Sequence, residues 1–225
     1  AKVLRIEGKH VGIENNFLIY DESDQKDLIK EIINELGLKE SVKPNSILYA
    51  ISEAKNQMLS PNNYFDLPTQ AGVARGDFAE TVFKIYKMYE KRLTEINALD
   101  FDDLLLKTVK LFEIPEVTNK WQKRITQIFI DEWQDTNKIQ YKLIKLLDGN
   151  RGVITAVGDS SQSIYSWRGA DYKNINYLIR DYPEIKIVNL EQNYRSTQNI
   201  LDAANFVISK NTMHPILKLW TEKGG

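Results

Sequence analysis

Apolar residues recur at helical spacing along the first half of the chain. One such face, in "SDQKDLIKEIINELGL" (residues 23–38), lies between Ser23 as a candidate N-cap and Gly37 as a stop. A second pattern covers residues 45–59, and the clearest one runs from residue 78 to 96 behind Asp77 as N-cap. Prolines and glycines between residues 60 and 76 indicate a loop. Residues 21–97 therefore predict a compact helical unit. Its expected core side chains are Leu28, Ile32, Leu48, Ile51, Val82, Ile85 and Tyr89.

The pattern changes after about residue 97. A short amphipathic helix is predicted over residues 100–112, ahead of Pro115. Three β-type runs follow, "ITQIFI" (125–130), "GVITAVG" (152–158) and "IKIVNL" (185–190), with helical patterns at 137–147 and 196–210. Buried strands that alternate with helices are typical of a parallel, doubly wound sheet. The sequence therefore predicts an α/β portion behind the helical unit.

The composition of the chain excludes several kinds of chemical site. The chain has 225 residues, a net charge of -1, no cysteine and two histidines, His10 and His214, far apart in sequence. Disulfides, thiolate metal sites and cysteine nucleophiles are therefore excluded, and a histidine metal site is not expected. With no global basic field, any contact with nucleic acid must come from a local groove, where base stacking carries much of the affinity.

No apolar run approaches the roughly 20 residues that span a bilayer, and no N-terminal signal pattern is present. We expect a cytoplasmic protein without membrane contact. The chain begins "AKVLRIEG", without a methionine and within a helical pattern, and ends "TEKGG". We therefore expect a piece of a longer polypeptide.

The first β-type run ends in two adjacent carboxylates, Asp131 and Glu132. Ligands of parallel α/β sheets bind at the carboxyl ends of the strands. In a nucleotide site the first carboxylate would hold Mg²⁺, usually through water, and the second would orient or deprotonate an attacking water. Alternatively, Asp131 caps the following helix. The dipeptide alone leaves both interpretations open.

The second run ends at Gly158 and Asp159, and a polar turn follows in which Gln162 is able to reach a phosphate. Tyr165, Trp167 and Arg168 come next, among serines and a glycine. The two rings are either core aromatics or members of an exposed loop, and their polar neighbours favour the loop. Two aromatics beside an arginine suit base stacking, at roughly 1–3 kcal/mol per base.

The third run ends at Leu190, and Tyr194 and Arg195 then precede a helix that Ser196 or Thr197 would cap. An arginine beside a helix N-terminus is well placed to bind a phosphate. Taken alone, Arg195 is equally consistent with a surface ion pair.

These segments resemble a known family. "DEWQDT" (131–136), "VGD" with "QSIYSWRGA" (157–170) and "LEQNYRST" (190–197) are similar to three consecutive motifs of superfamily 1A helicases of the UvrD/Rep/PcrA type, and "LDFDDLL" (99–105) resembles a fourth. The resemblance extends over essentially the whole chain. It implies part of a RecA-like (P-loop NTPase) parallel-sheet domain with a helical insertion domain.

The resemblance assigns ATP-site roles. Asp131 would sit in the Mg²⁺ shell and Glu132 would activate the hydrolytic water. Gln162 would sense the γ-phosphate, Tyr194 would pack on adenine, and Arg195 would contact the γ-phosphate.

The resemblance also implies a DNA path. Tyr165 and Trp167 would stack on single-strand bases with Arg168 close to the strand, and Lys55 lies where the family's helical insertion contacts the DNA backbone. Single-stranded DNA and junctions of duplex with single strand are the implied partners.

The phosphate-cradling loop is the main departure from the family. No segment fits G-x-x-x-x-G-K-[ST], since the pair Gly8-Lys9 is followed by His10. The resemblance places that loop upstream and a second motor domain downstream. Residues 1–20 would then end an upstream motor-domain helix and linker, 21–97 would form the insertion domain, and 98–225 the later part of the first motor domain.

The sequence as a whole favours a fragment of an ATP-dependent 3′→5′ DNA helicase that is inactive by itself. The motor of a helicase–nuclease, a translocase that does not unwind DNA, and a non-catalytic DNA-binding module are the alternatives.

Overall fold

The computed structural model describes residues 1–38, 42–66, 76–163, 174–210 and 217–224. The helices and strands, in chain order, are α1 (Lys2–Glu7), β1 (Leu18–Tyr20), α2 (Glu22–Glu35), α3 (Pro44–Asn56), α4 (Asp77–Glu95), β2 (Ala98–Asp100), α5 (Phe101–Phe112), α6 (Pro115–Gln122), β3 (Ile128–Ile130), α7 (Lys138–Asp148), β4 (Ile154–Ala156), α8 (Asn174–Asp181) and α9 (Gln198–Ile208). Short 3-10 turns cover Gly8–Val11, Pro61–Asp66, Trp133–Asp135 and Ser160–Gln162. None of the described helices is long and apolar enough to cross a membrane.

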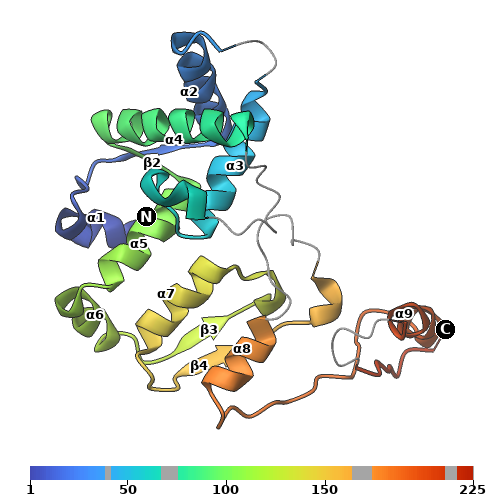
Figure 1. Cartoon of the computed structure of the whole chain (residues 1–225). Coiled ribbons are helices and arrows are strands. Elements are labelled where there is room, and N and C mark those ends of the chain that lie inside the picture. The colour runs from blue at the N-terminus through green and yellow to red at the C-terminus, as the bar shows by residue number, and fades with distance from the viewer. Residues whose placement is uncertain (39–41, 67–75, 164–173, 211–216, 225) are drawn as a thin grey trace.

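Helices α2, α3 and α4 pack on one another around a hydrophobic cluster of their own (Figure 1). Six of the seven expected core side chains are buried there, and Leu48 packs against the cluster only partly buried. The expected cap of α2 is wrong. Asp21, not Ser23, is the N-cap, because its carboxylate accepts hydrogen bonds from the backbone N–H groups of Ser23 and Asp24.

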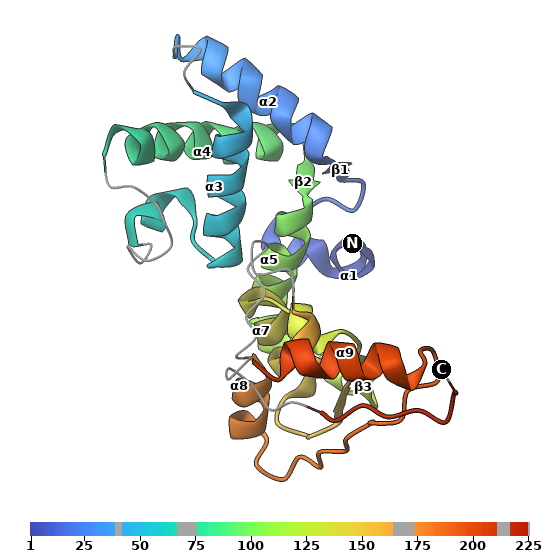
Figure 2. The same cartoon turned by 90° about the vertical axis from the view of Figure 1, so that its right-hand side faces the viewer.

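A short parallel strand pair joins the two ends of this helical unit. Strand β1, just before α2, pairs with β2, just after α4, in the register Leu18↔Ala98 and Tyr20↔Asp100. The helical unit therefore leaves the rest of the molecule and returns to it at the same place, as Figure 2 shows. The sequence patterns did not predict these strands, because each directly adjoins a helical pattern, whereas β3 and β4 lie within the longer β-type runs 125–130 and 152–158.

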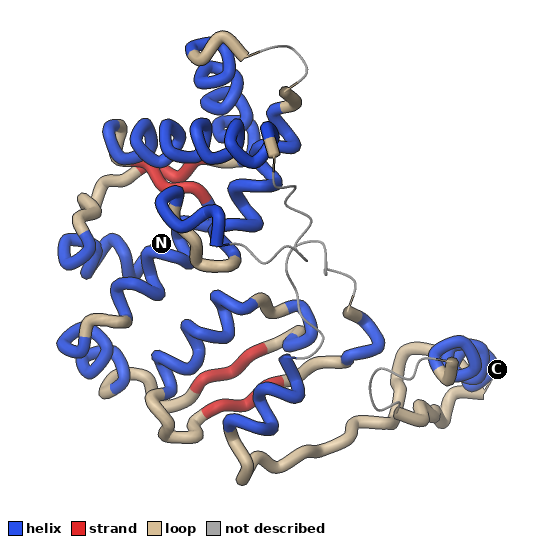
Figure 3. The backbone as a smooth tube through the Cα atoms, in the orientation of Figure 1, coloured by secondary structure: helices blue, strands red, loops and turns tan. Residues whose placement is uncertain are grey.

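The other half of the molecule contains a second parallel pair, β3 with β4, flanked by α7 and α8 (Figure 3). Helix α5 packs against α7 through Leu106, Val109 and Ile139 and lies between the two halves. The described chain is thus a mixed helix and strand fold with two small parallel sheets.

The third predicted strand is wrong. Residues 185–190 form no strand, and Ile187, Val188 and Leu190 are each about two thirds exposed or more (65%, 65% and 73%). An extended segment becomes a strand only where a neighbouring strand takes up its N–H and C=O groups, and within the described ranges none pairs with this one. The apolar run alone could not reveal this.

The core of the helical unit gives a direct test. Ile85 of α4 is fully buried, whereas Ile96 at the end of the same helix is 42% exposed. We expect Ile85→Ala to lower the free energy of unfolding by about 2–5 kcal/mol, because it leaves a cavity. Ile96→Ala, which removes the same atoms from a half-exposed position, should cost much less. Urea unfolding followed by circular dichroism compares the two, and equal costs would contradict this core.

Candidate nucleotide-binding and DNA-binding site

The site candidates meet at the carboxyl ends of β3 and β4. These strands are parallel in the register Ile128↔Ile154 and Ile130↔Ala156, so both end at the same edge. The backbone N–H of Trp133 donates to the carbonyl of Val157 at 2.9 Å and keeps the two chains together beyond the strands. The turn with Asp131 and Glu132 therefore lies beside the turn that runs from Asp159 to Gln162.

Asp131 is exposed at this edge, and its Oδ1 accepts a hydrogen bond from the N–H of Glu132 at 2.9 Å. It does not cap the helix that follows. Asn137 is the N-cap of α7, where its side chain accepts from the N–H of Gln140 at 3.0 Å. The interpretation of Asp131 as a helix cap is therefore wrong, and its carboxylate is available to a ligand.

The donor set at this edge fits Mg²⁺ that is shared with a nucleotide. Mg²⁺ usually keeps several waters and takes one or two carboxylates together with substrate phosphates. Asp131 supplies one such exposed carboxylate. No group of three candidate ligand residues exists among the described residues, so water and the phosphates would supply the remaining ligands.

Glu132 follows in an unusual backbone conformation. Its φ of 49° and ψ of 49° are left-handed, which is rare for a residue with a side chain and costs about 1–3 kcal/mol. Such strain gathers at functional sites. The exposed Glu132 carboxylate accepts a hydrogen bond from Gln134 Nε2 at 2.7 Å.

Gln162 ends the neighbouring turn. Its side-chain Nε2 donates to Asp159 Oδ2 at 3.0 Å, and Asp159 Oδ1 accepts from the N–H of Ser161 at 2.9 Å. Gln162 is exposed. The structure thus brings three of the predicted ATP-site residues, Asp131, Glu132 and Gln162, to one edge.

Tyr194 and Arg195 lie in a different part of the structure. Both are exposed, and Asn193 Oδ1 organises their turn by accepting from the N–H groups of Arg195 (2.9 Å) and Ser196 (2.7 Å). In Figure 1, the following helix α9 stands apart from β3 and β4. Among the described residues, Arg195 forms no ion pair. The structure therefore gives no support to the interpretation of Arg195 as half of a surface ion pair.

Tyr165, Trp167 and Arg168 lie outside the described residues. The described residues on both sides of this segment contact the carboxylate turn, by which we mean residues 131–136. Ser163 Oγ donates to the carbonyl oxygen of Gln134 at 3.4 Å, and the buried Asn174 donates through Nδ2 to Thr136 Oγ1 at 3.0 Å.

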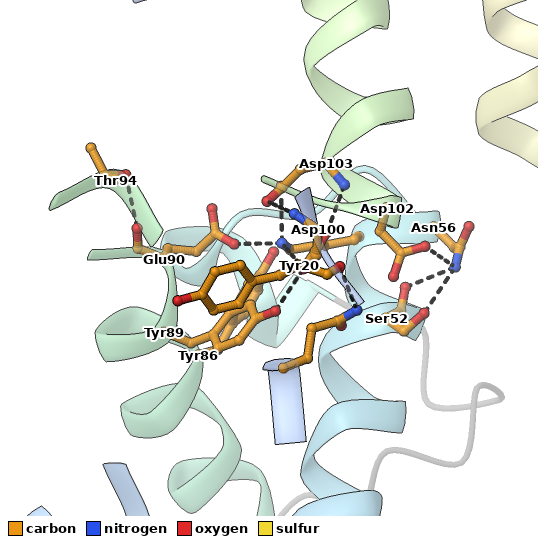
Figure 4. A network of polar contacts seen from close by, with 12 residues as sticks. Tyr20, Ser52, Asn56, Tyr86, Tyr89, Glu90, Thr94, Asp100, Asp102 and Asp103 are labelled. Carbon is orange, nitrogen blue, oxygen red and sulfur yellow. Dashed lines mark hydrogen bonds and ion pairs between the residues drawn. The ribbon is translucent and has the colours of Figure 1, made fainter. Parts of the chain in front are cut away.

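Lys55 is not a DNA contact. Its side chain is fully buried, and its ammonium pairs with Asp100 Oδ2 (2.7 Å), Glu90 Oε1 (2.7 Å) and Asp103 Oδ1 (2.9 Å). Figure 4 shows the carboxylates of this network converging from α4 and from the start of α5. Burial opposes the charge, but the surrounding carboxylates outweigh it, so the pKa of Lys55 stands well above its ordinary value. An ammonium held in this way cannot reach a phosphate.

The sequence carried a signal for this position. Ile47, Ile51 and Lys55 are spaced i, i+4 and i+8 along α3, so Lys55 continues the buried stripe of that helix. Asp100 and Asp103 are likewise spaced as a capping box, and they form one at the start of α5.

Comparison with known proteins shows the family of this chain. A family model described as the UvrD/REP helicase N-terminal domain matches residues 1–183, and the chain belongs to that family. Proteins named ATP-dependent DNA helicase PcrA are similar along its whole length. The one from Leuconostoc citreum is 44% identical over 226 residues, which covers 100% of this chain and 29% of the relative.

Two further relatives give the same picture. The protein of that name from Bacillus subtilis (strain 168) is 44% identical over 99% of this chain and 30% of its own length. The one from Staphylococcus epidermidis is 43% identical over 100% of this chain and 30% of its own length. The chain therefore spans less than a third of the length of these curated relatives.

The ion cluster around Lys55 predicts a specific pH dependence. Burial raises the pKa of Asp103 to about 7, and Asp100 and Glu90 add to this effect against the opposing pull of Lys55. An unfolded aspartate titrates near about 3.9, so between these values the folded chain holds a proton that the unfolded chain has lost. This group's contribution to the free energy of unfolding therefore falls as pH rises from about 4 to about 7.

Asp103→Asn removes that contribution. We expect the melting temperature of the variant, relative to that of the unmodified chain, to be higher at about pH 8 than at about pH 5. Asp24→Asn is the matched control, because Asp24 takes the same capping-box position in α2 but is exposed. If the difference in melting temperature between Asp103→Asn and the unmodified chain stays constant over this pH range, Asp103 does not titrate there.

Proposed function

We propose that this chain is part of an ATP-dependent DNA helicase that couples ATP hydrolysis to 3′→5′ movement on single-stranded DNA. The observation that carries this proposal is the shared edge of β3 and β4, where Asp131 and Glu132 lie beside the turn that ends in Gln162. Two parallel strand ends with a carboxylate pair on one and a polar turn on the other are suited to the γ-phosphate side of a nucleotide.

The chain's own residues would divide the work at this edge. Asp131 holds Mg²⁺, which when bound neutralises charge on the phosphates. Glu132 orients the attacking water and accepts its proton, and Gln162 contacts the γ-phosphate. Tyr194 packs on the adenine and Arg195 contacts the γ-phosphate. Both roles require the segment before α9 to approach the β3–β4 edge in the assembled enzyme.

We infer that residues 98–225 belong to a RecA-like motor domain and residues 21–97 to its helical insertion. The separate hydrophobic clusters of the two parts support this division. The exposed apolar side chains of Phe129, Ile187, Val188 and Leu190 also support it, since further strands of a larger sheet would cover them. The remainder of the helicase chain, with the phosphate-binding loop and a second motor domain, would supply those strands.

DNA recognition would fall to the segment between Ser163 and Asn174. Tyr165 and Trp167 would stack on successive bases and Arg168 would lie beside the backbone, because rings on a polar segment provide sequence-independent binding. Single-stranded DNA, and its junctions with duplex, are the proposed partners. Both flanks of this segment bond to the carboxylate turn, which gives a short path from nucleotide to DNA.

Nucleotide binding tests the proposal. Residues 1–225 carry no phosphate-cradling loop, so calorimetry with ATP and Mg²⁺ should show no binding tighter than the millimolar range, about -4 kcal/mol. The complete helicase chain should hydrolyse ATP, and single-stranded DNA should stimulate it. In that chain Glu132→Gln should abolish turnover and leave ATP binding intact, whereas Glu31→Gln, on the exposed surface of α2, should change neither.

Micromolar ATP affinity of residues 1–225 would show that the phosphate site has been assigned to the wrong segment. A complete chain without DNA-stimulated hydrolysis would overturn the proposed function itself and favour a non-catalytic DNA-binding module.

DNA binding has a separate test. In the complete chain, Trp167→Ala should weaken binding of a fluorescent single-stranded oligonucleotide by roughly 1–3 kcal/mol, because one stacking partner is lost. Trp220→Ala, which removes a partly exposed ring near the end of the chain, is the control and should leave the affinity unchanged. Equal affinities of the Trp167→Ala variant and the unmodified protein in fluorescence anisotropy would mean that the ring serves another purpose.

A further inference from the structure

A buried glutamine connects the two turns of the candidate ATP site. Gln134 is only 4% exposed, yet both polar atoms of its side chain are used. Its Nε2 donates to Glu132 Oε2 at 2.7 Å, and its Oε1 accepts from the backbone N–H of Asp159 at 2.9 Å. The amide orientation follows from its partners, since the reverse orientation would set an acceptor against the carboxylate and a donor against the N–H.

Gly158 lies very close to this side chain. A Cβ atom on Gly158 would lie 2.7 Å from Gln134 Oε1 and 2.9 Å from the Cβ of Trp133. Glycine at position 158 therefore allows the second strand end to approach the glutamine closely. A buried amide with both ends bonded is held in one orientation, because any rotation leaves a polar group unpaired.

The bonds of Gln134 continue on the far side of the Asp159 turn. The Asp159 carboxylate accepts from the N–H of Ser161 (2.9 Å) and from Gln162 Nε2 (3.0 Å). The carbonyl of Gln134 also accepts a hydrogen bond from Ser163 Oγ at 3.4 Å. Ser163 is the last described residue before Asn174. Through Gln134 and Asp159, protein atoms alone join Glu132 to Gln162.

Glu132 needs such support. It is exposed and its backbone is left-handed, and a glutamate side chain has three rotatable bonds. Without a fixed partner, its carboxylate would point at the attacking water for only part of the time. A catalytic group positioned within a fraction of an ångström depends on neighbours that are themselves held in place.

We propose that Gln134 is a positioning residue that aims the Glu132 carboxylate and fixes it to the turn from Asp159 to Ser163. The two turns then move together when the γ-phosphate binds or leaves. This inference rests on the proposed function for its catalytic consequence, but the clamp itself is a property of the protein that can be measured without turnover.

Two substitutions in the complete helicase chain separate the two bonds. Gln134→Ala removes both. Gln134→Glu keeps an oxygen that accepts from the Asp159 N–H but replaces the donor to Glu132 with a second carboxylate. We expect both variants to lower kcat for DNA-stimulated ATP hydrolysis by about 10–100-fold, as loss of an orienting neighbour does at other sites. The KM for ATP, and the Kd of a non-hydrolysable ATP analogue, should change less than about 3-fold, because the Gln134 side chain is buried and both of its polar atoms are bonded to Glu132 and Asp159.

Hydrogen exchange of the peptide covering residues 157–163, read by mass spectrometry without nucleotide, tests the clamp directly. Gln134→Ala should speed exchange of the Asp159 amide, and Gln134→Glu should restore its protection without restoring kcat. That combination separates positioning of Glu132 from general stability of the fold.

Gln122→Glu is the matched control. The side chain of Gln122 donates from Nε2 to the carbonyl of Leu146 at 2.7 Å, so the same substitution removes a comparable bond away from the site. We expect a lower melting temperature and unchanged kcat.

A kcat for Gln134→Ala within about 2-fold of the unmodified protein, in an otherwise active helicase, would overturn the positioning role. Unchanged exchange of the Asp159 amide would overturn the clamp whether or not the protein hydrolyses ATP. A complete chain with no ATPase at all, but with faster exchange in Gln134→Ala, would instead defeat the proposed function and leave the clamp standing.

Discussion

Parallel pairing of short strands is the constraint on which the whole arrangement depends. Two parallel strands cannot be joined by a tight turn, so the chain between them must form a longer crossover. Between β1 and β2 that crossover is the helical unit α2–α4, and between β3 and β4 it contains α7. The same rule therefore creates a separate helical unit at one pair and aligns the two turns that carry candidate site residues at the other.

The buried ion cluster extends the first pair into the rest of the molecule. Asp100 is both the last residue of β2 and the N-cap of α5, and its carboxylate accepts from Lys55 of α3 and from the Tyr89 hydroxyl of α4. Loss of one partner of a buried ion pair typically costs about 3–5 kcal/mol, since the other charge remains unpaired. With a single ammonium among three carboxylates, this cluster depends on Lys55 more than on any one acid. Its position explains why a charged residue occupies the apolar stripe of α3.

Local periodicity predicted α2 to α5, α7, α9 and the places of β3 and β4, because each of those patterns repeats within one segment. It did not predict the eight-residue helices α6 and α8. The predictions failed where the outcome depended on a distant partner. Strands β1 and β2 are defined by each other across the helical unit, and residues 185–190 lack a neighbour in the described ranges however apolar they are. Lys55 was misassigned for a related reason, since its spacing marked it as buried but only the folded chain shows which acids surround it. At the site, the carboxylates were recognisable as a strand end, whereas Gln134 was not, because its importance lies in contacts with residues 132 and 159 from two different turns.

The segment from Asp131 to Asn137 is the point where these separate parts meet. Asn137 donates from Nδ2 to Asn56 Oδ1 at 2.8 Å and so connects α7 with the end of α3, next to Lys55. Thr136 accepts from Asn174 at the start of α8. Gln134 reaches both Glu132 and the turn after β4.

A displacement of the Asp131–Asn137 segment would therefore break or alter its hydrogen bonds to the helical unit, to the turn after β4 and to both flanks of residues 164–173. Coupling of this kind requires bonds that cannot be satisfied independently, and the buried amides of Gln134, Asn137 and Asn174 meet that condition, because each would lose a partner if its neighbour moved alone.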